Sequence, residues 1–197
     1  MRRVYFLTHP EVIVDPLIPV PEWGLAERGR QRASDLARRL RNIGSVWSST
    51  EPKALETADL IGVRLELVPH ALEELGETDR SATGYLTEPE FWANYQEFLA
   101  RPSYSARGWE TAVDAQRRIV AAVDAVLADQ PAGSGDVVVV SHASVGALML
   151  CHLLGTPIQR LVDQPGQGSY FSFDADTGAD VTPWRLLEEL AVDTETS

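Results

Sequence analysis

Four consecutive valines, Val137–Val140, restrict the fold of this chain more than any other feature of its sequence. Because such a run has no polar face, it predicts a strand that is buried on both sides in the centre of a parallel sheet. The run continues directly into Ser141-His142, and an apolar helical segment follows it up to Leu154. A second short apolar run, Val4–Leu7, ends in the same way at Thr8-His9.

The rest of the apolar pattern alternates between strand and helix, which predicts an α/β fold: a three-layer αβα sandwich with a mostly parallel central sheet. Helices are expected at residues 27–41, 54–62, 87–102, 111–128 and 143–154, with Gly62 as the end of the second. Further strands are expected at 45–48, at 64–68 along an edge of the sheet, and as a late hairpin at 169–174 and 180–187. Residues 10–24 contain four prolines and are expected to form an extended loop.

At 197 residues the chain is expected to fold as one domain, because a single core can grow to roughly 250–300 residues. Residues 69–110 are expected to form an insertion over the end of the sheet. Within it, Thr87 followed three residues later by Glu90 predicts the start of a helix.

The charge and composition exclude several classes of function. The formal net charge of −12 argues against a protein that binds nucleic acid or an anionic membrane through bulk electrostatics. The single cysteine, Cys151, excludes an internal disulfide and a cysteine-based zinc cluster, and no HExxH spacing occurs, so neither a metal nor a cofactor is expected. No apolar run is long enough for a membrane helix or a signal peptide, so a cytoplasmic protein is expected.

The two histidines that follow the apolar runs are the most informative functional signal. Ligands of open parallel sheets bind beyond the carboxyl ends of the strands, so His9 and His142 are expected at the same end of the sheet. Histidine can act as a nucleophile or a proton carrier near neutral pH. His142 also precedes a helix, whose first N–H groups favour a bound anion. Together they indicate a site for an anionic substrate.

Four segments, in this order, resemble motifs of the histidine phosphatase superfamily, which has the phosphoglycerate-mutase-like fold. They are Tyr5–Glu11, Leu25–Gln31, Ser48–Ala58 and Val138–Gly146. The set is specific, although no single segment would be.

The resemblance implies a mechanism and a set of site residues. His9 would attack the phosphoryl group and carry it as a phosphohistidine, while His142 and the N–H of Ala143 would bind phosphoryl oxygens. An acid in the insertion, which would cover the active site, would protonate the leaving group and then activate water. Glu77 is the preferred acid because it lies next to Asp79-Arg80 and a polar turn, with Glu74 as the alternative.

The sequence also departs from the family pattern at the positions that bind phosphate. Thr8 and Lys53 stand where the family has arginines, and Pro10 stands where it has glycine. A guanidinium contacts phosphate with two parallel hydrogen bonds, whereas lysine offers a point charge and threonine a neutral hydroxyl. Arg80, from the insertion, is a candidate replacement cation, so Thr8, Lys53, Arg80 and Ala143 form the expected phosphate-binding set.

The resulting expectation is a metal-independent phosphatase that hydrolyses a phosphomonoester of a small molecule or a phosphoprotein. The departures at Thr8 and Lys53 leave open a second reading, a weak or inactive phosphate-binding pseudoenzyme of the same fold. A third reading, a serine hydrolase, comes from Ser144 in a near-match to the nucleophile elbow. It is disfavoured because the only later histidine, His152, lies two turns further along the same expected helix. The oligomeric state is open.

Overall fold

The computed structural model describes residues 2–131, 134–159 and 163–191, and it has a six-stranded sheet in the order β3-β2-β4-β1-β5-β6. The strands are β1 (Arg3–Thr8), β2 (Ile43–Ser48), β3 (His70–Ala71), β4 (Asp136–Ser141), β5 (Ser169–Asp174) and β6 (Arg185–Leu186). The first four strands run parallel to one another, whereas β5 is antiparallel to β1. The expected mostly parallel sheet is therefore confirmed.

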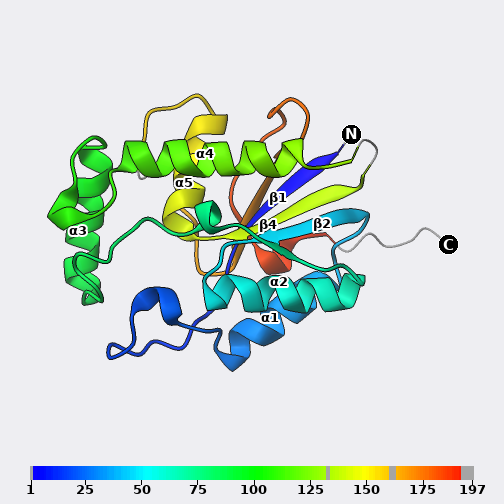
Figure 1. Cartoon of the computed structure of the whole chain (residues 1–197), viewed down its shortest axis with the longest axis horizontal. Helices are drawn as coiled ribbons and strands as arrows, with labels where there is room; N and C mark the ends of the chain where they lie inside the picture. The colour runs from blue at the N-terminus through cyan, green and yellow to red at the C-terminus, as the bar shows by residue number, and fades with distance from the viewer. Residues whose placement is uncertain (1, 132–133, 160–162, 192–197) are drawn as a thin grey trace.

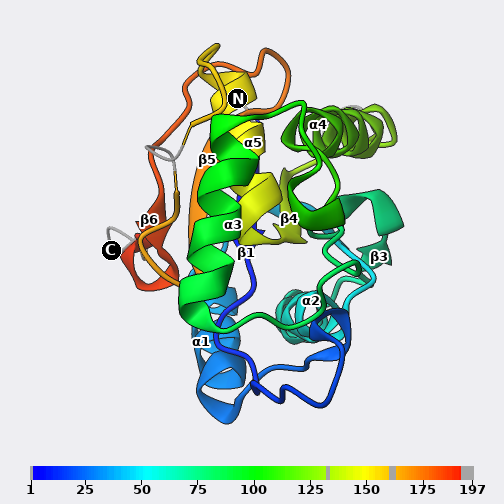
Figure 2. The same ribbon diagram turned by 90° about the vertical axis from the view of Figure 1, so that its left-hand side faces the viewer.

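Helices cover both faces of this sheet (Figure 1). They are α1 (Glu27–Ala37), α2 (Pro52–Leu65), α3 (Glu88–Ala100), α4 (Ala112–Ala128) and α5 (Ala143–Leu153). α4 and α5 lie on one side of the sheet and α1 and α2 lie on the other, which gives the predicted three layers. α3 stands apart from both layers, beyond the carboxyl ends of β1 and β4 (Figure 2).

The four valines occupy the centre of the sheet, as their pattern predicts. β4 lies between β1 and β2, and all four side chains are fully buried. Val137 and Val139 belong to the core shared with α4 and α5, whereas Val138 and Val140 belong to the core shared with α1 and α2. The alternation of a strand thus supplies both cores from one apolar run.

The expected strand at 64–68 is wrong. Instead α2 continues through Gly62 to Leu65, and Glu66 ends it in the left-handed region with φ of 57°. A Cβ at Gly62 would lie 2.7 Å from the carbonyl oxygen of Leu67, so the glycine permits close packing of the chain after the helix and does not stop the helix. The edge strand of the sheet is β3, a few residues later.

Other elements differ from the prediction mainly in length. α1 ends at Ala37, four residues before the expected Arg41, and the second strand of the hairpin is reduced to β6. Residues 69–110 begin with β3, a strand of the sheet itself, and contain α3. The predicted helix start is confirmed, because the N–H and the hydroxyl of Thr87 both donate to the Glu90 carboxylate, at 3.1 and 2.6 Å. Within the described residues, no helix is both long and apolar enough to span a membrane.

Candidate active site

The pairing of β1 with β4 brings the two histidines together. Thr8 and Ser141 are register partners at the ends of these parallel strands, and the N–H of His9 donates to the Ser141 carbonyl at 3.2 Å. The residue after each strand therefore lies at the same end of the sheet. The ring centroids of His9 and His142 are 5.3 Å apart, with the rings inclined at 64°.

The half-buried ring of His9 has one nitrogen engaged and one available. Its Nδ1–H donates to the carbonyl oxygen of Pro10 at 2.9 Å, which leaves Nε2 as the unprotonated nitrogen of the neutral ring. Burial is the main cause that lowers the pKa of His9 to about 3, and the nearby His142 lowers it further. The ring is therefore neutral at physiological pH, the state that a nitrogen nucleophile requires.

His142 is held far more tightly. It is fully buried at the N-cap of α5, and its Nε2 lies 2.7 Å from Ser49 Oγ and 3.2 Å from Glu51 Oε1. Burial lowers the pKa of His142 to about 3 although Glu77 opposes the shift, so the contact with Glu51 is a hydrogen bond to a neutral ring. Its Nδ1 is buried and has no hydrogen-bond partner among the described residues.

The carboxylate of Glu77 lies at the first turn of α5. Its Oε2 accepts from the N–H of Ser144 at 3.2 Å, and its Oε1 accepts from Val145 at 3.3 Å and Thr78 at 2.8 Å. Burial raises the pKa of Glu77, but Arg80, His142 and these N–H donors together outweigh it and lower the pKa to about 2. The partial positive charge of the helix N-terminus favours the same ionised state.

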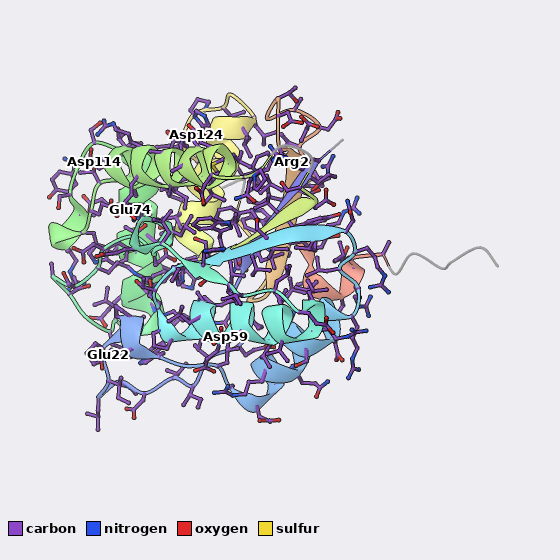
Figure 3. The ribbon with its side chains drawn as sticks, turned by 45° about the vertical axis from the view of Figure 1, so that its right-hand side comes forward. Arg2, Glu22, Asp59, Glu74, Asp114 and Asp124 are labelled. Carbon is purple, nitrogen blue, oxygen red and sulfur yellow. The ribbon has the colours of Figure 1, made fainter. Side chains whose placement is uncertain are left out.

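Glu74, the alternative acid, lies outside this arrangement. Its side chain is exposed, in the segment between α2 and α3 beside α4 (Figure 3). Arg118 donates to the backbone carbonyl of Glu74 at 2.8 Å. Of the two acids named from the sequence, the structure brings Glu77 to His142.

The two residues at the family's arginine positions are both bound to other parts of the protein. The buried ammonium of Lys53 pairs with Glu51 and also donates to the carbonyls of Val20 and Pro21 at 2.9 and 3.4 Å. These contacts match its three N–H groups. The buried hydroxyl of Thr8 donates to Gln164 Oε1 at 2.6 Å and accepts from the N–H of Ser169 at 3.0 Å.

Among the described residues, Arg80 is the cation near the histidines that is not paired with a carboxylate. Its guanidinium carbon lies 5.2 Å from the ring centroid of Phe91 and 5.6 Å from that of Trp109, and no carboxylate of the described residues forms an ion pair with it. Its charge lowers the pKa of both Glu77 and His142. The aromatic faces hold the cation without neutralising it.

Sequence reasoning missed Glu51, which connects the parts of the site. Besides its contacts with Lys53 and His142, its Oε1 accepts from the N–H of Glu77 at 3.0 Å. Glu51 is the N-cap of α2 and follows β2, which ends beside β4. A polar residue between a strand and a helix at this end of the sheet was the signal available, the same signal that identified His142.

The structure is that of an α/β protein with two histidines paired at the carboxyl ends of neighbouring parallel strands. Comparisons with known proteins identify the family that has this arrangement. The sequence matches the family model of the histidine phosphatase superfamily (branch 1) over residues 19–179, so the chain belongs to this superfamily. The matched range begins after His9. No curated protein matches the sequence.

Several solved structures, two of them named as phosphatases, resemble nearly the full length of this chain. The mycobacterial glucosyl-3-phosphoglycerate phosphatase in complex with inorganic phosphate is 25% identical, with a TM-score of 0.76 over 94% of this chain and 95% of that one. YhfR of Bacillus stearothermophilus is 23% identical, with a TM-score of 0.76 over 100% and 98%. The α-ribazole phosphatase of Shigella flexneri is 20% identical, with a TM-score of 0.70 over 98% and 99%. The superfamily and the similarity to the glucosyl-3-phosphoglycerate phosphatase support a hydrolase.

Proposed function

We propose that this protein is a metal-independent phosphatase that hydrolyses a phosphomonoester through a phosphohistidine on His9. The observation that carries the proposal is the neutral His9 ring 5.3 Å from His142, with its Nδ1 bound to Pro10 and its Nε2 unprotonated. The two rings lie where a parallel sheet binds ligands. The matched superfamily and the relatives support the same chemistry.

In the first step Nε2 of His9 attacks phosphorus, and the bond from phosphorus to the ester oxygen breaks. Nδ1 keeps its proton, so the hydrogen bond to Pro10 stabilises the positive charge that forms on the ring. The departing oxygen takes a proton from Glu77. In the second step Glu77 takes a proton from water, the water oxygen attacks phosphorus, and the phosphorus–nitrogen bond breaks to restore His9.

The low pKa of Glu77 determines how the proton enters the site. At about 2, that pKa keeps Glu77 ionised in the free enzyme at neutral pH. A phosphoryl anion beside the carboxylate raises the pKa of Glu77, because two like charges compete in one small site. We therefore propose that the proton arrives with the monoanion of the ester, whose second pKa is about 6.

Three groups are proposed to bind the phosphoryl oxygens. Uptake of a second proton from solvent as the anion binds makes His142 a donor through Nδ1, and Glu51 then balances its charge. The N–H of Ala143 is available in the first turn of α5, because Glu77 engages the two N–H groups that follow it. Arg80 supplies a positive charge that no carboxylate of the described residues pairs with, whereas Lys53 and Thr8 are bound within the protein and have a supporting role.

The proposed substrate is a small phosphorylated molecule, with a phosphoprotein as the alternative. The insertion at residues 69–110 is proposed to cover the active site, since it supplies both Glu77 and Arg80 and α3 lies beyond the strand ends (Figure 2). Two of the similar structures support a small substrate by their names, the glucosyl-3-phosphoglycerate phosphatase and the α-ribazole phosphatase.

Hydrolysis of p-nitrophenyl phosphate by the purified protein tests the proposal. The wild type should hydrolyse the ester. With radioactively labelled substrate and a quench in base, it should also retain a phosphoryl group as acid-labile phosphohistidine. His9→Ala should lose both signals, while His152→Ala, at the exposed last turn of α5, should keep them. Activity that survives the loss of His9 would contradict the mechanism.

A second function, binding of a phosphorylated ligand without turnover, is favoured by one observation. The residues at both arginine positions of the family, Thr8 and Lys53, have their donors engaged within the protein. A binder of this kind would give a calorimetric signal with inorganic phosphate or vanadate but no phosphoenzyme and no hydrolysis. The same samples therefore distinguish the two functions.

A further inference from the structure

Arg118 of α4 uses all of its hydrogen-bond donors on one short segment and one carboxylate. Nη1 donates to the carbonyls of Glu74 and Gly76 at 2.8 and 2.9 Å, and Nη2 donates to the carbonyl of Glu77 at 3.2 Å. Nε and Nη2 also donate to the carboxylate of Glu110 at 3.0 and 2.8 Å. These five bonds match the five N–H groups of a guanidinium.

Glu110 fixes the other side of the same segment. Its N–H donates to the carbonyl of Asp79 at 2.9 Å, and its carboxylate accepts from the N–H of Asp79 at 3.2 Å. Arg118 is three-quarters buried, with 24% of its side chain exposed. The backbone on both sides of Glu77 is therefore attached to α4 by Arg118 and to the residue before its N-cap, Glu110. Arg118 has no further donor to offer a substrate.

We propose that Arg118 is a positioning residue for the proton transfer performed by Glu77. The proposal rests on the proposed function, and it concerns a residue that lies outside the phosphate-binding set. By holding the carbonyls of residues 74, 76 and 77, the guanidinium sets where the backbone of Glu77 lies relative to α5. The carboxylate then reaches the N–H groups of Ser144 and Val145, beside His142.

The geometry of the donor group matters more than its charge. Lysine at this position would keep the positive charge but would offer three donors from one atom, against five from a planar fork. It could not hold three carbonyls and a carboxylate together. A displacement of about 1 Å in a catalytic group can cost about 10²-fold in rate. Arg118→Lys should therefore behave like Arg118→Gln.

The leaving group of the substrate provides a readout that a merely structural role would not change. Phenyl phosphate and p-nitrophenyl phosphate share a ring, but phenolate is the much more basic leaving group, with a pKa near 10 for a phenol. Only the phenyl ester needs a proton from Glu77 as its bond breaks. The quantity to compare is kcat/KM, because it reports the steps up to formation of the phosphohistidine.

Arg118→Gln and Arg118→Lys should each lower kcat/KM for phenyl phosphate by roughly 10- to 100-fold and that for p-nitrophenyl phosphate by less than about 3-fold. Glu77→Gln should produce a contrast in the same direction, with a larger loss for phenyl phosphate. Arg117→Gln is the matched control, since Arg117 is the neighbouring arginine, 72% exposed and paired with Asp114 in its own helix. In this control kcat/KM should be unchanged for both substrates.

The outcomes separate the inference from the proposed function. Equal losses for the two substrates, or no loss for phenyl phosphate in folded variants, would overturn the role of Arg118 while hydrolysis still depends on His9. Hydrolysis that does not depend on His9 would instead overturn the proposed function. Thermal unfolding identifies folded variants, and Arg118→Lys carries the test if Arg118→Gln does not fold.

Discussion

The two strand ends that deliver histidines differ in how firmly they hold them. After β1, His9 leads into a loop, its ring is half-buried, and a single carbonyl binds it. After β4, His142 opens α5 at once, its ring is fully buried, and Ser49 and Glu51 both bind one nitrogen. Two similar sequence patterns thus produce a ring with an available nitrogen and a ring that is locked.

This difference matches the two roles that the proposed reaction needs. A nucleophile must approach phosphorus and carry it, so its reacting nitrogen has to be free of protein partners. A group that stabilises the phosphoryl oxygens acts best when it is already fixed before the substrate arrives, because no reorganisation is then needed. The number of bonds that each ring makes therefore assigns the roles more firmly than the sequence around it.

The largest expected effects come from replacing each ring by asparagine. His9→Asn should abolish both turnover and the trapped phosphoenzyme, since no other nucleophile replaces Nε2. His142→Asn should slow turnover by roughly 10²–10³-fold, the usual cost of losing one preorganised donor, yet still form phosphoenzyme. Quench-flow labelling with radioactive substrate measures both. A phosphoenzyme in His9→Asn, or its loss in His142→Asn alone, would reverse the assignment.

The fold and the position of the two histidines could be predicted from the sequence, and the reason is physical. Val4–Leu7 and Val137–Val140 pack on both faces of the sheet, so their apolar runs have no competing interpretation, and each histidine lies two positions after such a run. The prediction of a strand at 64–68 was wrong because apolar residues at 65 and 67 also fit the last turn of a helix and the segment that follows it.

The contacts that organise the site could not be predicted, because they join residues far apart in the chain. Glu51 meets a partner 26 residues away and Arg118 meets carbonyls more than 40 residues away. Arg117 and Arg118 are adjacent and chemically identical, yet one is 72% exposed and the other 24%. No local pattern distinguishes an arginine in solvent from one that binds a loop.

The second expected effect concerns the two acids of the insertion. Glu77→Gln should lower kcat by roughly 10²–10⁴-fold, the range for general acid–base catalysis, because its carboxylate lies at α5 beside His142. Glu74→Gln should stay within about 2-fold, since the reaction uses no part of its exposed side chain. Steady-state hydrolysis of phenyl phosphate compares them. A larger loss in Glu74→Gln would move the proton donor to Glu74.

A smaller effect is expected for Arg80, the cation that lies over Phe91 and Trp109. Arg80→Ala should weaken binding of inorganic phosphate by roughly 10- to 100-fold, the cost of one charge-assisted hydrogen bond. Arg80→Lys should restore part of it, because an ammonium keeps the charge and the contact with Phe91 but not the second donor. Titration calorimetry measures the dissociation constant of inorganic phosphate for each variant. Unchanged affinity in Arg80→Ala would remove Arg80 from the phosphate-binding set.

The smallest expected effect is on stability, and it tests whether both rings are neutral. Burial lowers the pKa of His9 and of His142 to about 3 in the folded protein, whereas an unfolded histidine titrates near 6.5. As pH falls below about 6.5, the unfolded chain binds protons that the folded chain does not, so the free energy of unfolding falls.

Each ring adds a slope of at most about 1.4 kcal/mol per pH unit between pH 6 and pH 5, before most carboxylates titrate. Urea unfolding across this range gives the slope of the unfolding free energy against pH. This slope should decrease by about the contribution of one ring in His9→Asn, and by the same amount again in the double variant with His142→Asn. His152→Asn, exposed on α5, is the control and should keep the full slope. If His142→Asn alone left the slope unchanged, the fully buried ring would be charged in the folded protein. Its contact with Glu51 would then be an ion pair, and the contrast between the two strand ends would be one of charge as well as of packing.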